Sequence, residues 1–113
     1  MRINYFRRKK MNQQVYEEIK SLKRQLLPDE RVILFGSRAR GDEHEESDWD
    51  LLILLNKKEK SPKDEEKYAF PFVLAGWKHG TYISVKLYSE EEWEKKQPSI
   101  LRYNVEQEGI EIA

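Results

Sequence analysis

Two aspartates and a glycine-serine turn are the residues of this 113-residue chain that could do chemistry together. Asp48 and Asp50 stand two positions apart at the head of an apolar run, and side chains two apart on a strand share one face. Two carboxylates this close repel each other unless a cation lies between them. Mg²⁺ binds proteins through one or two carboxylates plus substrate phosphates. We therefore expect Asp48 and Asp50 to be metal ligands and catalytic residues.

A glycine-serine pair follows another apolar run and could hold a phosphate. Glycine at position 36 would let backbone amides approach a phosphate closely, and Ser37 adds a hydroxyl donor. Arg38 and Arg40 come next and could neutralise phosphate charge. Each feature alone is common in surface turns, where Gly36 and Ser37 would only end a strand and Asp-x-Asp would only face water. The two features together, a phosphate-binding turn beside metal-binding carboxylates, are the arrangement for metal-assisted phosphoryl or nucleotidyl transfer.

Two helices are predicted around these runs. The first covers residues 12–27, where apolar residues fall at helical spacing and Pro28 ends the pattern. Its apolar positions are Val15, Ile19, Leu22 and Leu26. The second covers residues 61–79, with Ser61 as N-cap, and Pro71 should kink or split it.

The remaining pattern predicts strands and a last short helix. Short apolar runs predict buried strands over residues 32–35 and 50–55, and alternation predicts a third over 81–88. Ser89 and Glu92 have the spacing of a capping box, which opens a helix. The tail after residue 100 is compatible with a short edge strand near its end. This order predicts an α/β fold, a small mixed β-sheet packed with helices.

Composition favours one domain and narrows the classes of function. Residues 1–11 read as a basic N-terminal arm, and residues 12–113 as a single domain with 12% aromatic residues in the whole chain. No cysteine is present, which excludes disulfides and thiolate metal sites and fits a reducing cytoplasm. No apolar run is long enough to span a membrane, so we expect no membrane partner. With 21 basic and 21 acidic residues, nucleic acid is an unlikely partner.

The spacing of the turn and the aspartates resembles that of a known superfamily. Gly36-Ser37, ten further residues and then Asp48-x-Asp50, between two apolar strands, is similar to the nucleotidyltransferase superfamily of DNA polymerase beta. The motif Gly-Ser-Arg-Ala-Arg-Gly at residues 36–41, followed by Ser-Asp-x-Asp-Leu at residues 47–51, resembles that of the minimal nucleotidyltransferases, a short prokaryotic branch of the superfamily. Residues 88–93 and 104–110 resemble that branch too. The resemblance therefore extends over nearly all of residues 12–112.

This resemblance implies Mg²⁺-dependent transfer of a nucleoside monophosphate, AMP from ATP, to a hydroxyl of a protein or small molecule. Gly36 and Ser37 would hold the nucleoside triphosphate, with Arg38 or Arg40 against its phosphates. Asp48 and Asp50 would hold the metals. In this branch the acceptor is often a helical partner of the HEPN type, with the transferase as antitoxin of a toxin–antitoxin pair. With 113 residues, a partner chain or a homo-oligomer would have to complete the acceptor site.

One position departs from the family pattern. The family usually carries a third carboxylate on the next core strand, and alignment puts Ser84 there, between Tyr82 and Lys86 on the polar face. Catalysis is then weakened, rescued by another acid or lost. The chain would in the last case be a nucleotide-binding module that neutralises a partner by contact. A nucleic-acid-binding regulator is the third and least favoured hypothesis. ATP turnover with a partner separates the first two, and a salt-dependent nucleic-acid shift would support the third.

Overall fold

A computed structural model describes the backbone of residues 5–44 and 47–113, with side chains from Asn12 onward. The elements in chain order are α1 (Tyr5–Leu26), β1 (Arg31–Phe35), α2 (Ser37–Arg40), β2 (Trp49–Leu55), the π-helical turn η1 (Glu65–Ala69), α3 (Phe70–Lys78), β3 (Ile83–Ser89), α4 (Glu90–Lys95), α5 (Ile100–Glu108) and β4 (Ile110–Glu111).

The strands form one mixed sheet in the order β3-β2-β1-β4. β1 runs antiparallel to both β2 and β4, whereas β2 and β3 are parallel. The parallel pair is joined by the crossover through η1 and α3. This sheet with its covering helices confirms the predicted fold class.

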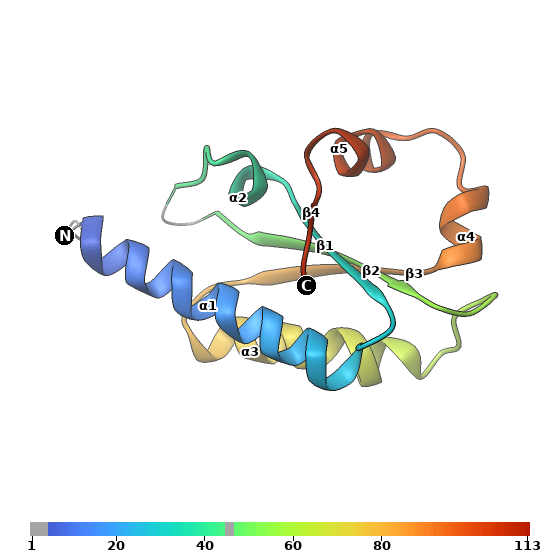
Figure 1. Cartoon of the computed structure of the whole chain (residues 1–113), viewed down its shortest axis with the longest axis horizontal. Helices are drawn as coiled ribbons and strands as arrows, with labels where there is room; N and C mark the ends of the chain where they lie inside the picture. The colour runs from blue at the N-terminus through green and yellow to red at the C-terminus, as the bar shows by residue number, and fades with distance from the viewer. Residues whose placement is uncertain (1–4, 45–46) are drawn as a thin grey trace.

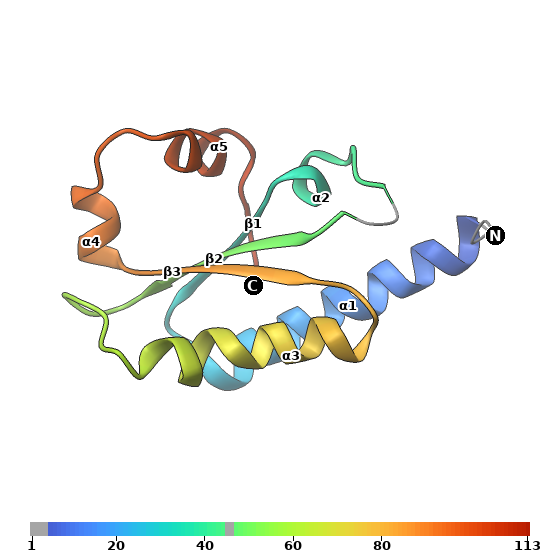
Figure 2. The ribbon, with the colours of Figure 1, turned by 180° about the vertical axis from the view of Figure 1, so that it is seen from behind.

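Helices cover both faces of the sheet. α1 and α3 lie on one face, and α2, α4 and α5 lie on the other (Figures 1 and 2). One buried cluster joins Ile19 of α1 and Phe72 of α3 to the sheet, and a second joins Trp93 of α4 and Val105 of α5 to the opposite face. Because both faces are covered, β1 and β2 are buried almost continuously, which explains their unbroken apolar runs.

The first helix begins earlier than the apolar pattern predicts. Val15 and Ile19 are buried as expected, but the helical backbone extends back to Tyr5. Residues 5–11 therefore continue α1, while residues 1–4 lie outside the described residues. The division into an arm over residues 1–11 and a domain over 12–113 stays a prediction.

The predicted start of the second helix at Ser61 is wrong. The backbone N–H of Ser61 donates to the buried carboxylate of Asp64 at 2.6 Å, and Lys57 Nζ donates to the same oxygen at 2.8 Å. This carboxylate closes a turn, so the helical segment begins after it, with η1 at Glu65. Pro71 lies in the first turn of α3, at the junction with η1, which confirms the predicted split.

Local capping signals identify the later elements. Glu92 N–H donates to Ser89 Oγ at 3.0 Å and Ser89 N–H donates to Glu92 Oε1 at 2.9 Å, which confirms the capping box. α5 was not predicted, although the Ser99 hydroxyl accepts from Arg102 N–H at its start. β4 confirms the expected short edge strand.

Candidate functional site

The pairing of β1 with β2 brings the glycine-serine turn against an aspartate. Phe35 pairs with Asp50 in the antiparallel register, and Gly36 follows with a φ of 80°. A Cβ atom placed on Gly36 would lie 2.3 Å from Asp50 Oδ2. The Ser37 carbonyl accepts hydrogen bonds from the backbone N–H groups of Gly41 at 2.9 Å and Asp42 at 3.1 Å. The site thus requires glycine at position 36 for two reasons, its positive φ and its contact with the carboxylate.

Asp50, on β2, faces away from the helical layer of α1 and α3, and Asp48 directly precedes that strand. Trp49 between them is 4% exposed and packs into the core on that layer's side, so Asp50 faces the side of α2 and α5. Asp48 is exposed and Asp50 is half-buried. Burial raises the pKa of Asp50, and the neighbouring charge of Asp48 raises it further. A cation beside the two carboxylates would relieve this repulsion.

Asp48 and Asp50 alone would supply only part of a metal coordination shell. Over residues 5–44 and 47–113, no group of three or more His, Cys, Asp or Glu side chains could hold a metal ion. Two carboxylates offer hard oxygen ligands, and the phosphates of a nucleotide can supply others. The chemistry of this donor set therefore fits Mg²⁺ that arrives together with a nucleotide.

The strand beside β2 carries a serine and a lysine on the face of the aspartates. Asp50 pairs with Ser84 in the parallel register of β2 and β3, and Leu52 pairs with Lys86. Lys86 lowers the pKa of Asp50, against the larger effects of burial and Asp48. The position level with Asp50 on the next strand is thus a neutral hydroxyl, followed by a cation.

Arg38 connects the turn to the loop that precedes β2. Its Nε and Nη2 donate to the Ser47 carbonyl at 3.2 and 2.9 Å, and its Nη1 donates to Asn12 Oδ1 at 3.0 Å. The guanidinium also lies 4.7 Å from the centroid of the Trp49 ring. These contacts fix the backbone just before Asp48, a role that the sequence did not reveal. The expected contact of Arg38 with a nucleotide stays a prediction.

Arg40 reaches a carboxylate from the end of the chain. Its Nη1 donates to Glu108 Oε2 at 2.7 Å, and its Nε donates to Asp42 Oδ2 at 3.1 Å. Glu108 is not among the site residues that the sequence predicts. The two partners are 68 positions apart, so no local spacing rule relates them.

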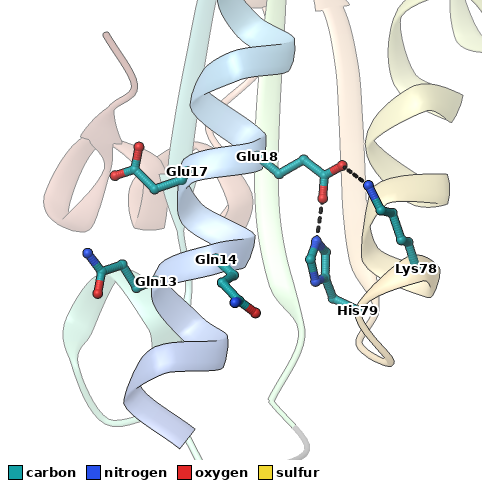
Figure 3. Close-up of a pocket in the computed structure, with 6 residues that line it drawn as sticks. All are labelled: Gln13, Gln14, Glu17, Glu18, Lys78 and His79. Carbon is teal, nitrogen blue, oxygen red and sulfur yellow. Dashed lines mark hydrogen bonds and ion pairs between the residues drawn. The ribbon is translucent and has the colours of Figure 1, made fainter. Parts of the chain in front are cut away.

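A pocket lies between α1 and the end of α3, in the other helical layer (Figure 3). Inside it, the Glu18 carboxylate accepts from Lys78 Nζ at 3.2 Å and contacts His79 Nε2, as the dashed lines show. Gln13, Gln14 and Glu17 complete its lining. His79 follows α3 directly, so this cluster ties the end of α3 to α1.

This cluster predicts a pH-dependent contribution to stability. Burial alone would raise the pKa of Glu18, but hydrogen bonds with His79 and Lys78 lower it below its ordinary value. A carboxyl group whose pKa is depressed by folding stabilises the fold above its unfolded pKa, and that contribution disappears as the pH falls through the folded pKa. We expect Glu18→Gln to lower the free energy of unfolding by about 1 kcal/mol at neutral pH and by much less near pH 3.

Urea unfolding at both pH values measures this difference. Glu17→Gln is the matched control, since Glu17 is the neighbouring, more exposed acid of the same helix and should show little effect at either pH. A Glu18→Gln effect of equal size at both pH values would show that the loss comes from packing rather than from charge.

Comparison with known proteins assigns the chain to a family. The family model described as "Nucleotidyltransferase domain" matches residues 14–108. A Methanocaldococcus jannaschii protein named "Putative protein adenylyltransferase MJ0141" is 43% identical over 70 residues, which cover 52% of this chain and 71% of that protein. A solved structure described as "Crystal structure of the toxin-antitoxin with AMP-PNP" superposes with a TM-score of 0.60, at 21% identity, over 87% of this chain and 72% of that one. The chain therefore belongs to the nucleotidyltransferase domain family and has its fold.

Proposed function

We propose that the protein is a Mg²⁺-dependent nucleotidyltransferase that moves a nucleoside monophosphate, AMP from ATP, to a hydroxyl of a protein or small molecule. The observation that carries this proposal is the close approach of the glycine-serine turn to Asp50. It would place a phosphate-binding turn against a carboxylate that binds the metal. The name of the Methanocaldococcus relative supports AMP as the transferred group, and the AMP-PNP of the solved neighbour supports a nucleoside triphosphate.

The transfer breaks one phosphate bond and forms another. The acceptor oxygen attacks the α-phosphorus, the bond from that phosphorus to the α,β-bridging oxygen breaks, and pyrophosphate leaves while the hydroxyl proton passes to a base or to water. Bound Mg²⁺ would supply neutralisation of the charge on the phosphate oxygens. Asp48 and Asp50 would hold it, and Gly36 and Ser37 would hold the phosphates by backbone and hydroxyl donors.

The side chain at position 84 should limit the rate of this transfer. A serine hydroxyl is neither an anionic ligand nor a base near neutral pH, and loss of a general base typically costs ~10²–10⁴-fold in rate. We therefore expect weak or absent transfer by the native protein, with nucleotide binding retained. Ser84→Asp should raise transfer and tighten Mg²⁺ binding, because its carboxylate would stand level with Asp50 on the next strand.

Transfer of labelled AMP to a candidate partner, compared between the native protein and Ser84→Asp, checks this expectation. Ser84→Asn is the matched control, since its side chain has a similar size without the charge. Strong native transfer that Ser84→Asp reduces would show that the third acid comes from elsewhere or is not required.

We propose a HEPN-type helical protein as the partner, with this chain as the antitoxin of the pair in the cytoplasm. The description of the solved neighbour as a toxin–antitoxin supports the antitoxin role, and the HEPN class of the partner rests on the family resemblance. Large apolar side chains are exposed along the outer side of α3 and just after it, at Phe70, Leu74, Trp77 and Tyr82, as surface that a partner chain or a second copy could cover. None of the described helices is long and apolar enough to cross a membrane.

Calorimetric titration with ATP tests the proposal in its simplest form. ATP should bind measurably more tightly with Mg²⁺ than with EDTA. A protein that binds Mg²⁺-ATP and neutralises its partner without turning ATP over would be the catalytically impaired binding module. Equal affinity in Mg²⁺ and EDTA would contradict the metal-dependent site.

A further inference from the structure

The guanidinium of Arg40 is held by two carboxylates of very different exposure. Glu108 Oε2 accepts from Arg40 Nη1 at 2.7 Å, and the Glu108 side chain is 13% exposed. Asp42 Oδ2 accepts from Arg40 Nε at 3.1 Å, and the Asp42 side chain is 61% exposed. A short charge-assisted hydrogen bond to the sheltered carboxylate is screened less by salt and water. Glu108 is therefore the stronger anchor of the two.

The backbone that follows Glu108 is fixed by the end of α5 and by the sheet. Gly109 N–H donates to the Val105 carbonyl at 2.9 Å, and a Cβ on Gly109 would lie 2.7 Å from Ile33 Cγ2. One residue further, Ile110 pairs with Leu34 of β1. Glu108 thus projects from a position that packing and strand pairing fix independently of Arg40.

Arg40, in contrast, lies on a helix of only four residues beside the glycine-serine turn. Its backbone N–H donates to the Gly36 carbonyl at 3.0 Å, so the guanidinium originates one turn beyond the residue that touches Asp50. The ion pair is therefore at the edge of the candidate site rather than on a remote surface.

We propose that Glu108 is a positioning residue that holds the guanidinium of Arg40 where the β- and γ-phosphates of a bound nucleoside triphosphate lie. This inference rests on the proposed function. A guanidinium has five N–H donors, and the two hydrogen bonds to Asp42 and Glu108 leave others to meet a phosphate. An acid at a triphosphate site repels the ligand unless it orients a cation, and the pair with Arg40 gives Glu108 that role.

If Glu108 already holds the Arg40 side chain in place, ATP binding does not have to pay the conformational entropy of ordering that side chain. Immobilising such a side chain costs about 0.5–1.5 kcal/mol, so Glu108→Gln should weaken Mg²⁺-ATP binding up to roughly tenfold. AMP lacks the β- and γ-phosphates, so its affinity should stay unchanged. The ratio of ATP affinity to AMP affinity is the readout that a merely structural role would not move, since general loosening of the fold would weaken both ligands.

A double-mutant cycle by calorimetry tests the proposal. Arg40→Ala should weaken Mg²⁺-ATP at least as much as Glu108→Gln, and adding Glu108→Gln to Arg40→Ala should weaken it no further. Glu106→Gln is the matched control, since Glu106 is an acid of the same helix that pairs instead with Arg102, and it should leave ATP affinity unchanged. Thermal unfolding of each variant verifies that it is folded.

Failure of this inference is distinguishable from failure of the proposed function. If the native protein does not bind Mg²⁺-ATP, the proposed function itself is wrong. If the native protein binds and Glu108→Gln binds equally well or more tightly, Glu108 does not position Arg40 for the triphosphate. Equal weakening by Glu108→Gln in the native and the Arg40→Ala background would likewise overturn the inference.

Discussion

The double substitution of Asp48→Asn and Asp50→Asn, made in the Ser84→Asp background so that transfer is measurable, should abolish the Mg²⁺ dependence of ATP binding and reduce AMP transfer by at least about 10³-fold. Asparagine keeps the size of each side chain and removes the charge that would hold the cation. Calorimetry with Mg²⁺ and with EDTA measures the first effect, and transfer of labelled AMP measures the second. Unchanged Mg²⁺-ATP affinity in the double variant would contradict the assignment of these residues.

Unfolding of the variant is not expected to confuse this result. Burial and the charge of Asp48 raise the pKa of Asp50, which means that folding disfavours the ionised form. The stability that a group with a raised pKa contributes is present at low pH and is lost as the pH rises through the folded pKa. The charge on Asp50 is therefore unfavourable to the fold wherever it is present, and Asp50→Asn, which cannot carry that charge, should unfold at the same or a higher temperature than the native protein.

Gly36→Ala should have the second largest effect, with a loss of roughly 10²-fold in transfer when it is made in the Ser84→Asp background. The new Cβ would meet Asp50 Oδ2 at 2.3 Å, so the carboxylate or the turn must shift. The φ of 80° adds backbone strain of ~1–2 kcal/mol for a residue other than glycine. Mg²⁺-ATP affinity and transfer rate should fall together, because the turn proposed to bind the phosphates and the Asp50 carboxylate proposed to bind Mg²⁺ are both displaced.

Gly80→Ala is the control for backbone strain alone. Gly80 also has a positive φ, 69°, but a Cβ there would meet nothing within 4 Å, and it lies after α3. The control should lose stability and keep nucleotide affinity. Normal nucleotide binding by Gly36→Ala would mean that Gly36 only ends β1.

The part of the fold that the sequence predicts is the part encoded locally. Unbroken apolar runs predict β1 and β2, because helices on both sides leave no wet face to produce alternation. The capping box at Ser89 is a pattern of four residues, and it holds in the structure. The face of Asp50 follows the same logic, since it depends only on the alternation of β2, whereas Asp48 precedes that strand and its shared face with Asp50 stays a prediction.

What the sequence did not reveal depends on distant partners. The Asp64 carboxylate accepts hydrogen bonds from the Ser61 N–H and from Lys57 Nζ. The turn that it closes comes before the helical segment, so Ser61 is not its N-cap. α5 has one buried residue, Val105, so its apolar pattern is faint despite the Ser99 cap. Arg38 and Glu108 reach across the fold to Asn12 and Arg40, and only the tertiary structure brings those pairs together.

Transfer from ATP labelled at either the α- or the γ-phosphate is the most direct test of the central claim. The acceptor to assay is a candidate HEPN-type helical partner, incubated with the native chain or with Ser84→Asp. We expect label on the acceptor from α-labelled ATP only, weak with the native chain, stronger with Ser84→Asp, and lost when Asp48→Asn and Asp50→Asn are added. Label from the γ-phosphate, or α-label that persists in the double variant, would contradict a nucleotidyl transfer at this site.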